Sequence, residues 1–278
     1  MFIKFLNRLL LVLVIGMLVL GISVLAFADE GDSILDRILK DKVMRVGVPP
    51  DVVNWSIVNP NTGKWEGISI DIMEYLAEGM GVKVEYKSVD WQVFPLELNA
   101  GSIDIFAGTA HFTIPRAIQV AYPHPVFWKA TGFVTLTKNV EKFKSLEDIN
   151  KKGVKIAVGI GTNEDQKAKY YYPNAEVLRM KTGAHTDLAA AVQAGQADLA
   201  AFGHLNAWDF SRKFDWCSMP IKPIEPSMQS FPIKYGDWKW YIFLNAYFQQ
   251  ISLSGLVDRI VSQWFPEMPD EIRNVSPY

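Results

Sequence analysis

Residues 93–108 read VFPLELNAGSIDIFAG, and this stretch carries the pattern that decides the fold. Its first part, 93–101, reads as a short helix that ends at a glycine, and 102–108 reads as a short buried strand. A helix that leads directly into an apolar strand is one unit of an α/β protein. Similar units on either side would make this class the expected fold.

Strand and helix patterns alternate in both directions from this stretch. Upstream, 43–48 and 82–89 read as strands on either side of an amphipathic helix pattern. Downstream the alternation starts again. Two β-α runs, one within 43–136 and one within 154–203, therefore predict an α/β fold of two lobes with largely parallel sheets.

Residues 1–28 have the three parts of a secretory signal peptide. Lys4 and Arg8 make the start basic, 9–25 is a continuous apolar run, and Ala-Phe-Ala at 26–28 fits an A-x-A cleavage site. The apolar run is also long enough for an uncleaved membrane anchor, and that alternative stays open. We expect export by a signal peptide, and therefore a periplasmic or extracellular protein.

Length, charge and cysteine content fit an exported protein without a nucleic-acid partner. Removal of residues 1–28 from the 278 leaves 250, enough for one large or two moderate domains. Two of the 28 basic residues lie in the leader, so 26 remain against 30 acidic ones, and there is no basic run that suggests nucleic acid. Cys217 is the sole cysteine, which excludes an internal disulfide. We expect it to be buried packing.

The sequence contains no pattern typical of covalent or metal-dependent catalysis. There is no G-x-S-x-G elbow and no Cys/His nucleophile arrangement. The histidines lack metal-ligand spacing; they are His111, His124, His185 and His204. We therefore expect no catalytic residue, no metal and no cofactor.

A guanidinium stands in a loop of small residues, AGTAHFTIPRA at 107–117. Arg116 keeps its charge under ordinary conditions, and its planar fork of donors matches a carboxylate or a phosphate. Two interpretations follow. Arg116 is either a surface helix residue with a local acidic partner or the anion-holding group of a site.

The stretch VGIGTNED at 158–165 places a glycine loop between a strand and a helix. It lacks the third glycine of a dinucleotide fingerprint and the lysine of a phosphate loop, so a nucleotide is not indicated. The start of the helix still offers free N–H groups at Gly161 and Asn163, with the Thr162 hydroxyl, to a small anion. Simple N-capping by Thr162 or Asn163 is the equal alternative.

Six blocks of the sequence, taken together and in order, are typical of one family. They are GISIDIMEYLAEGMG (67–81), DWQVFPLELNAGSIDIFAG (90–108), TIPRA (113–117), VKIAVGIGTNED (154–165), AVQAGQADLAAF (191–202) and LVDRIVSQWF (256–265). With these blocks the chain resembles the bacterial extracellular solute-binding proteins of family 3, the receptors of polar amino-acid ABC importers. The resemblance covers nearly all of 29–278.

This resemblance implies a two-lobe type II periplasmic-binding fold that closes over a ligand about a two-segment hinge. Lobe one would comprise 29–138 and 233–278, and lobe two 139–232. The chain would cross between lobes near Leu136–Glu141 and again near Ser230–Tyr235.

The resemblance also implies roles for residues of lobe one. Arg116 matches the arginine that grips the α-carboxylate of the ligand. Gly108, Thr109 and His111 match the loop that supports that grip, and Trp91 matches a position where an apolar or aromatic side chain packs on the ligand.

In lobe two, Thr162 with the N–H groups of Gly161 and Asn163 matches an anion clamp. A single carboxylate of the ligand would then be shared between the two lobes. For a small anion at this helix start, the resemblance favours binding over simple capping.

One position departs from the family pattern. Relatives that bind α-amino acids usually have an aspartate where this chain has Gly203, and that carboxylate pairs with the ammonium of the ligand. Without it, either Asp51, Glu164 or Asn206 takes its place or the ligand lacks an α-ammonium, because an unpaired buried ammonium costs several kcal/mol. His204, next to Gly203, is a candidate to bind a neutral or anionic group. A one-residue slip in the comparison is the remaining explanation.

The resemblance leaves two functions from different classes. The first is a monomeric binding protein that captures a small carboxylate-bearing solute, a polar amino acid or a related compound, and delivers it to the membrane permease of an ABC importer. The second is an enzyme similar to cyclohexadienyl dehydratase, which has this fold and the GTNE loop seen at 161–164. The catalytic glutamate of those enzymes would fall near Asn206, whose amide does not donate a proton as an acid does, so that Glu164, His111 or His204 would have to serve instead. We therefore expect a binding protein and not an enzyme.

Overall fold

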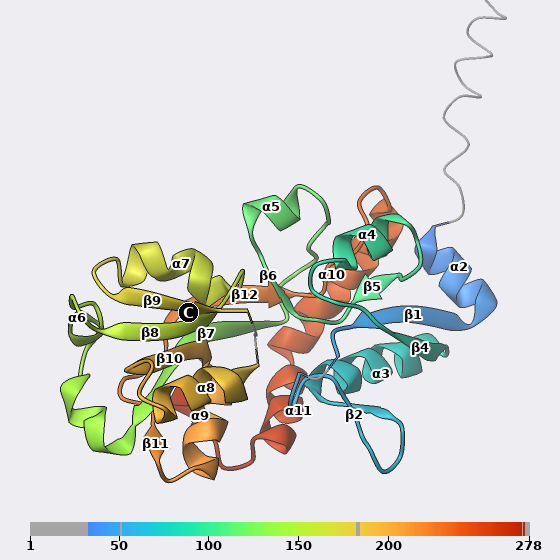
Figure 1. Ribbon diagram of the computed structural model, residues 1–278. Helices are drawn as coiled ribbons and strands as arrows, with labels where there is room; N and C mark the ends of the chain where they lie inside the picture. Colours follow the sequence, from blue (N-terminus) through green and yellow to red (C-terminus); the bar gives the residue numbers. More distant parts are fainter. Residues whose placement is uncertain (1–32, 51, 182–183, 274, 276–278) are drawn as a thin grey trace, which may run out of the picture.

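The computed structural model describes residues 33–50, 52–181, 184–273 and 275. It consists of two α/β lobes that lie side by side and are joined by strands running between them (Figure 1). The predicted signal peptide, 1–28, lies outside the described residues. In the part of the chain that the structure describes, no helix has the length and hydropathy needed to cross a membrane.

Lobe one is built on a three-stranded parallel sheet in the order β4–β1–β5. Helix α3 packs its Ile72 and Leu76 into the lobe-one core and ends where Gly81 adopts the left-handed conformation. The elements are α2 (Ile34–Asp41), β1 (Val43–Val48), β2 (Ile57–Val58), β3 (Trp65–Glu66), α3 (Ile68–Met80), β4 (Lys83–Ser88), α4 (Phe94–Asn99), β5 (Ile105–Phe106), β6 (Ala110–His111), α5 (Ile114–Ala117), α10 (Trp238–Leu253) and α11 (Leu256–Trp264).

Lobe two is built on a larger mixed sheet of seven strands, in the order β6–β12–β7–β10–β8–β9, with β11 paired to β7. β8 pairs in parallel with β9 and β10, whereas β7 is antiparallel to its neighbours. The elements are β7 (Phe127–Leu136), the 3₁₀ helix η1 (Thr137–Lys142), α6 (Leu146–Ile149), β8 (Lys155–Gly159), α7 (Asn163–Tyr171), β9 (Glu176–Met180), α8 (His185–Gln193), β10 (Leu199–Gly203), α9 (His204–Lys213), β11 (Cys217–Ser218) and β12 (Ile224–Ser230). The last helix, α12 (Asp270–Arg273), follows α11, and its Ile272 packs against the lobe-one core.

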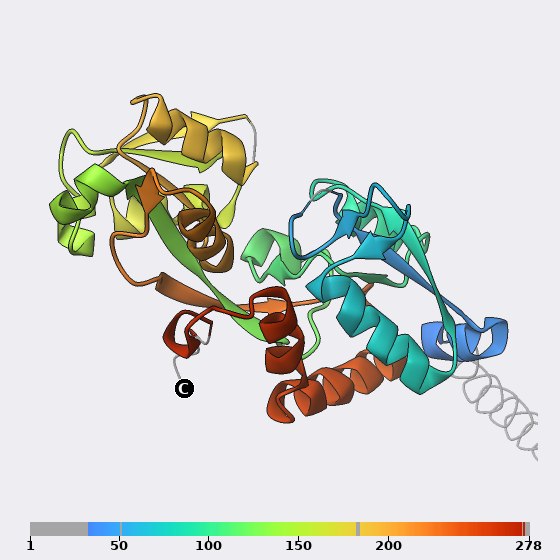
Figure 2. The ribbon, with the colours of Figure 1, turned by 90° about the horizontal axis from the view of Figure 1, so that it is seen from below.

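The lobes are connected by β7 and β12, which are neighbours in the larger sheet (Figure 2). Val126 and Phe231, at the lobe-one ends of these strands, pack in the lobe-one core, whereas Phe133 and Ile224 pack in lobe two. β7, one continuous strand of 10 residues, therefore has side chains in both cores. The predicted crossing at Leu136–Glu141 lies at the far end of this strand and stays a prediction.

Most of the strands and helices expected from the sequence are present. β1 and β4 lie within 43–48 and 82–89, β8 and β10 lie within the run 154–203, and the mixed α/β architecture confirms the predicted fold class. The lobe-one sheet is parallel as expected, whereas the lobe-two sheet is mixed, because β7 is antiparallel to its neighbours. Cys217 is buried and free, as expected. The exact lobe boundaries stay a prediction.

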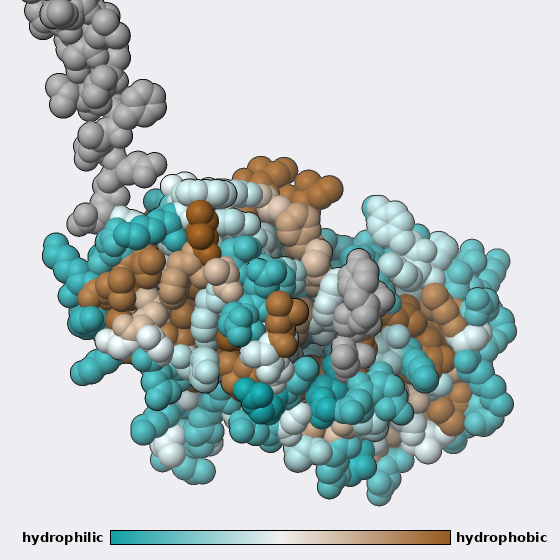
Figure 3. Space-filling view, turned by 180° about the vertical axis from the view of Figure 1, so that it is seen from behind, coloured by the Kyte–Doolittle hydropathy of each residue, from teal (hydrophilic) through white to brown (hydrophobic). Residues whose placement is uncertain are grey.

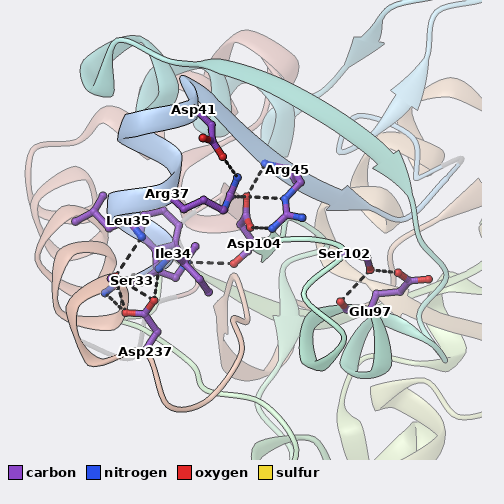
Figure 4. Close-up of polar contacts among 11 residues, drawn as sticks. Ser33, Ile34, Leu35, Arg37, Asp41, Arg45, Glu97, Ser102, Asp104 and Asp237 are labelled. Atoms are coloured by element: carbon purple, nitrogen blue, oxygen red, sulfur yellow. Dashed lines mark hydrogen bonds and ion pairs between the residues drawn. The ribbon is translucent and has the colours of Figure 1, made fainter. Parts of the chain in front are cut away.

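A buried ion-pair cluster holds α2 against β1 (Figure 4). The Asp104 side chain is only 1% exposed; its Oδ1 lies 2.7 Å from Arg45 Nη2, and Arg37 forms a second ion pair with it. The backbone N–H of Arg45 donates to Asp104 Oδ2 at 2.8 Å. The polar residue in the apolar 102–108 stretch therefore neutralises two arginines of lobe one.

Candidate functional site

Arg116 differs from the two arginines that Asp104 neutralises. It lies in the short helix α5, and its guanidinium carbon is 5.8 Å from the ring centroid of Trp91 and 5.6 Å from that of Phe94. In the described part of the chain, no acidic side chain forms an ion pair with it. Burial lowers the pKa of Arg116 from its usual value. Of the two interpretations, the surface residue with a local acidic partner has no support among these contacts.

Helix α5 itself stands out from the body of the protein. Ile114 is 73% exposed and Ile118, just after the helix, is 74% exposed. Seen from behind, hydrophobic groups rise at the upper rim between the two lobes, where α5 lies in Figure 1 (Figure 3). Helix α5, which contains Arg116, therefore lies at the rim between the lobes (Figure 1).

The loop before α5 is fixed by close packing and by polar contacts. A Cβ on Gly108 would lie 2.2 Å from Phe106 Cε1 and 3.0 Å from Trp91, so this position accepts only glycine without rearrangement. Thr109 is buried and has a positive φ of 48°. His111 Nδ1 lies 2.8 Å from the hydroxyl of Ser227 on β12. This last contact ties the loop to the connecting strands.

Trp91 lies beside this loop at the end of the lobe-one sheet. Its ring packs edge-on against Phe106, with 5.4 Å between centroids, and it is partly exposed. The indole therefore packs against Phe106 and also lies beside the Arg116 guanidinium. Its role as a surface for the ligand stays a prediction.

Lys129, on the connecting strand β7, contacts the candidate site and was not predicted from the sequence. Its Nζ donates to Thr109 Oγ1 at 3.3 Å and lies 3.7 Å from the ring centroid of Trp55. Burial lowers the pKa of Lys129 to about 7, and the charge of Glu164 on lobe two acts in the opposite direction. The only signal in the sequence was a lysine between large apolar residues in VFWKATG at 126–132.

Several positive charges act on the imidazole of His111. Burial lowers the pKa of His111 to about 3, and the positive charges of Lys129, Lys167 and Arg116 add to this effect in that order. The imidazole is therefore neutral at physiological pH. The site has an excess of positive charge on its lobe-one side and along the connecting strand.

The polar groups of the lobe-two loop bind one another. Thr162 Oγ1 caps α7 by accepting from the Asp165 N–H at 3.3 Å and donates to the Gly159 carbonyl at 2.8 Å. The Gly161 N–H donates to Asp165 Oδ2 at 3.0 Å, and Asp165 also pairs with Arg179. The capping alternative is thus what this conformation shows. The anion clamp stays a prediction that requires these bonds to be exchanged.

Asn163 and Glu164 follow at the start of α7. Glu164 is 8% exposed. Burial raises its pKa, and the charges of Lys129 and Lys167 counteract part of that rise. The Glu164 carboxyl group is therefore close enough to Lys129 and Lys167 to interact with their charges. It forms no ion pair with Lys129 in the described part of the chain.

Gly203 and His204 lie where β10 passes into α9. A Cβ built on Gly203 would meet only Asn206 Oδ1, at 3.8 Å, so packing does not require a glycine there. The His204 ring is completely buried, and its Nδ1 accepts from the Ala130 N–H of β7 at 3.0 Å. In this conformation it has no exposed surface for a ligand, and its role as a ligand contact stays a prediction. Asp51, the other acidic candidate, lies outside the described residues.

A separate hollow of about 400 Å³ lies on lobe one, beyond α5. Its lining is aromatic and includes Phe112, Tyr235 and Trp238. It is lined by neither Arg116 nor Lys129, and its lining lysine, Lys234, shares the hollow with the carboxylate of Asp237. We therefore place the candidate site between the lobes, where the unpaired cations are.

The arrangement can hold an anion but shows no set of groups for a metal. Among the described residues, no cluster of three His, Cys, Asp or Glu side chains has a suitable arrangement. The structure brings Trp91, Gly108, Thr109, His111 and Arg116 together on lobe one. The predicted lobe-two residues lie on the start of α7 and on the β10–α9 junction.

Comparison with known proteins finds solute-binding proteins both by family model and by sequence identity. The family model of bacterial extracellular solute-binding proteins, family 3, matches residues 44–267. A glutamine-binding protein of Geobacillus stearothermophilus is 30% identical over 188 residues, which cover 66% of this chain and 70% of the relative. A cyclohexadienyl dehydratase of Pseudomonas aeruginosa is 24% identical over 84% of this chain and 86% of its own length.

Solved structures give the same fold. The crystal structure of the ancestral amino acid-binding protein AncCDT-1, a precursor of cyclohexadienyl dehydratase, superposes with a TM-score of 0.72. It is 28% identical, and the match covers 84% of this chain and all of that one. The two-lobe arrangement of the described residues is therefore that of known periplasmic-binding proteins.

Proposed function

The chain belongs to the bacterial extracellular solute-binding proteins, family 3, and from that premise we propose that it captures a small carboxylate-bearing solute between its lobes. A membrane permease of an ABC importer would receive the solute. Relatives that include a glutamine-binding protein support a ligand of amino-acid size. The expected state of the protein is a monomer, exported by residues 1–28.

The observation that carries this proposal is the unpaired guanidinium of Arg116. It is partly buried beside Trp91 and Phe94, and the described residues supply no acidic partner. A charged group removed from water without a partner is costly, and an anionic ligand removes that cost. A bidentate bond to a carboxylate is the geometry that a guanidinium favours.

Closure of the lobes completes the site in this proposal. The lobe-two loop would exchange its own bonds at Thr162 and Gly161 for bonds to the ligand. Contacts from both lobes stabilise the closed form, because a ligand shifts a conformational equilibrium only by its difference in affinity for the two states.

We also propose that the protein binds its solute without converting it. A related dehydratase makes the alternative specific. Asn206, at the position expected for the catalytic glutamate, is buried and has no acidic proton. Incubation with prephenate distinguishes the two, with formation of the aromatic product measured by ultraviolet absorbance. We expect binding at most, and turnover would contradict the proposal.

Thermal unfolding against paired ligands tests the proposed function. Each pair is an α-amino acid and its deaminated analogue, and the primary amide of the same acid is the control that lacks the carboxylate. A ligand present at a hundred times its dissociation constant adds about 2.7 kcal/mol to the free energy of unfolding. We expect at least one carboxylate to raise the melting temperature and its amide control to leave it unchanged. If no carboxylate among the pairs does so, the proposed function is wrong.

A further inference from the structure

We propose that the solute carries two acidic groups, one bound by Arg116 and the other by Lys129. This inference rests on the proposed function and names the chemical class of the ligand: a small dicarboxylate, or a carboxylate with another anionic group. An α-ammonium is not required. The juxtaposition that carries it is of two cations beside one loop: Lys129 donates to Thr109, in the loop that leads to Arg116, and neither cation has an ion pair among the described residues.

Lys129 is held in place for contact with a ligand. Its ammonium lies 3.3 Å from Thr109 Oγ1, in the loop that leads to Arg116, and 3.7 Å from the Trp55 ring centroid. Its Cα pairs with Ser227 across the two connecting strands. A hydroxyl and an aromatic face stabilise a cation in part, but neither supplies a negative charge.

Three other cations that are partly withdrawn from water have carboxylate partners. Arg37 and Arg45 share Asp104, and Lys167 on lobe two pairs with Glu225. Lys129 has no ion pair among the described residues, and burial lowers its pKa to about 7. A cation in this position is stabilised when a ligand brings the missing negative charge.

The facing side of lobe two does not offer that charge in full. Glu164 is the carboxylate whose charge reaches Lys129, yet burial favours its protonated form by raising its pKa. Gly203 has no side chain, and a Cβ built there would meet only Asn206 Oδ1, at 3.8 Å. Two cations facing one desolvated carboxyl group match a ligand with two negative charges better than a zwitterion, whose one carboxylate is offset by its ammonium.

Ligands that share the same carbon skeleton separate the contribution of the second acidic group from that of the α-ammonium. Glutarate, glutaramate, glutamate and glutamine differ only in the distal group, carboxylate or amide, and in the α-ammonium. Succinate and adipate, with their monoamides, extend the set to other lengths. We expect a diacid to bind at least tenfold more tightly than its monoamide, which corresponds to about 1.4 kcal/mol.

Substitutions at Lys129 test whether this residue causes the preference for a diacid over its monoamide. Lys129→Met should bring each diacid to within about threefold of its monoamide (less than 1.4 kcal/mol), whereas Lys129→Arg should keep the preference. Lys138→Met is the matched control, because it removes the same charge from an exposed residue just beyond β7. Retained binding of monocarboxylates through Arg116 shows that the Lys129→Met protein is folded.

The pH dependence gives an independent readout. Between pH 6 and 9 the groups facing Lys129 are Glu164 on α7 and the histidines His111, His185 and His204, whose pKa values are lowered to about 3 or 4. Those imidazoles stay neutral, while Lys129 loses its proton above about 7. Affinity for the diacid should therefore fall as the pH rises through that range, and Lys129→Met should abolish this fall.

The outcomes separate this inference from the proposed function. If carboxylates bind but monoamides bind as tightly as diacids, or if Lys129→Met keeps the preference, the two-anion assignment is overturned and the proposed function stands. If only α-amino acids without a second acid bind, the assignment is overturned as well. If no carboxylate of any kind binds, the proposed function itself fails.

Discussion

The two sides of the site hold their polar groups in opposite states. On the lobe-one side and along the connecting strand, Arg116 and Lys129 carry charge without an acidic partner among the described residues. On the lobe-two side, Thr162 and Gly161 are engaged with Asp165 and Gly159 of their own loop. One side is ready for an anion, whereas the other must break internal bonds first.

This difference suggests the order in which contacts form. An anion that meets the open protein gains electrostatic stabilisation at once from the cations of lobe one. The lobe-two contacts add a smaller net amount, since each new hydrogen bond replaces one that the free protein already has. Most of the binding energy should therefore depend on lobe one, and substitutions on the two sides test that expectation.

The largest effect is expected from Arg116→Ala. Truncation of one partner of a desolvated charge pair costs 2–5 kcal/mol, so the dissociation constant for a carboxylate ligand should rise by about a hundredfold. Isothermal titration of both proteins with the same ligand measures this change. Arg259→Ala, on the exposed face of α11, is the control for loss of an arginine charge. Unchanged affinity in Arg116→Ala would remove lobe one as the main source of binding.

An intermediate gain is expected from Gly203→Asp. The position has a negative φ of −54°, and a Cβ there meets only Asn206 Oδ1 at 3.8 Å, so the side chain fits. A carboxylate here gives lobe two a partner for an ammonium, and affinity for α-amino acids should improve by about tenfold, or about 1.4 kcal/mol. Gly203→Asn is the uncharged control. No gain in any amino acid of a titrated panel would show that the missing charge does not decide specificity.

The smallest change in binding is expected from Thr162→Ala. Loss of the N-cap of α7 should lower the free energy of unfolding by about 1 kcal/mol. Affinity should fall by only about threefold, because the hydroxyl exchanges one hydrogen bond for another. Thr162→Ser, which keeps the cap, is the matched control in denaturant titration and ligand titration. A loss of affinity as large as that of Arg116→Ala would show that the two sides contribute equally.

The sequence was sufficient for the elements whose patterns are local. Alternating apolar residues predicted β1 and β4, and the helix pattern predicted α3 with an end at Gly79 or Gly81, of which the structure shows Gly81. The α9 helix was not predicted, because its first residues include a histidine and an asparagine that have no helical signal of their own. Packing on β7 stabilises that helix, and such packing is not visible in a short window of sequence.

The residues of the candidate site that lie in one local segment were also predicted, and those that depend on distant contacts were not. Arg116 and its loop form one continuous segment, so the structure brings together residues that the sequence already placed side by side. Lys129 depends on contacts with Thr109 and Trp55, which are distant along the chain. The N-cap bonds of Thr162 were one of two alternatives, and local spacing does not decide between them.

The place of Lys129 on a connecting strand has a mechanical consequence. When two bodies rotate about a hinge, points near the axis travel little and points far from it travel far. Lys129 lies on β7, one of the strands that join the lobes, and a register shift in β12 between Ile224 and Ser227 lies opposite it. If an anion binds there as proposed, that contact has a short lever arm: it forms before closure and persists through it. Changes at Lys129 should then alter the rate of capture, whereas changes at the distant loop of α7 should alter the rate of release.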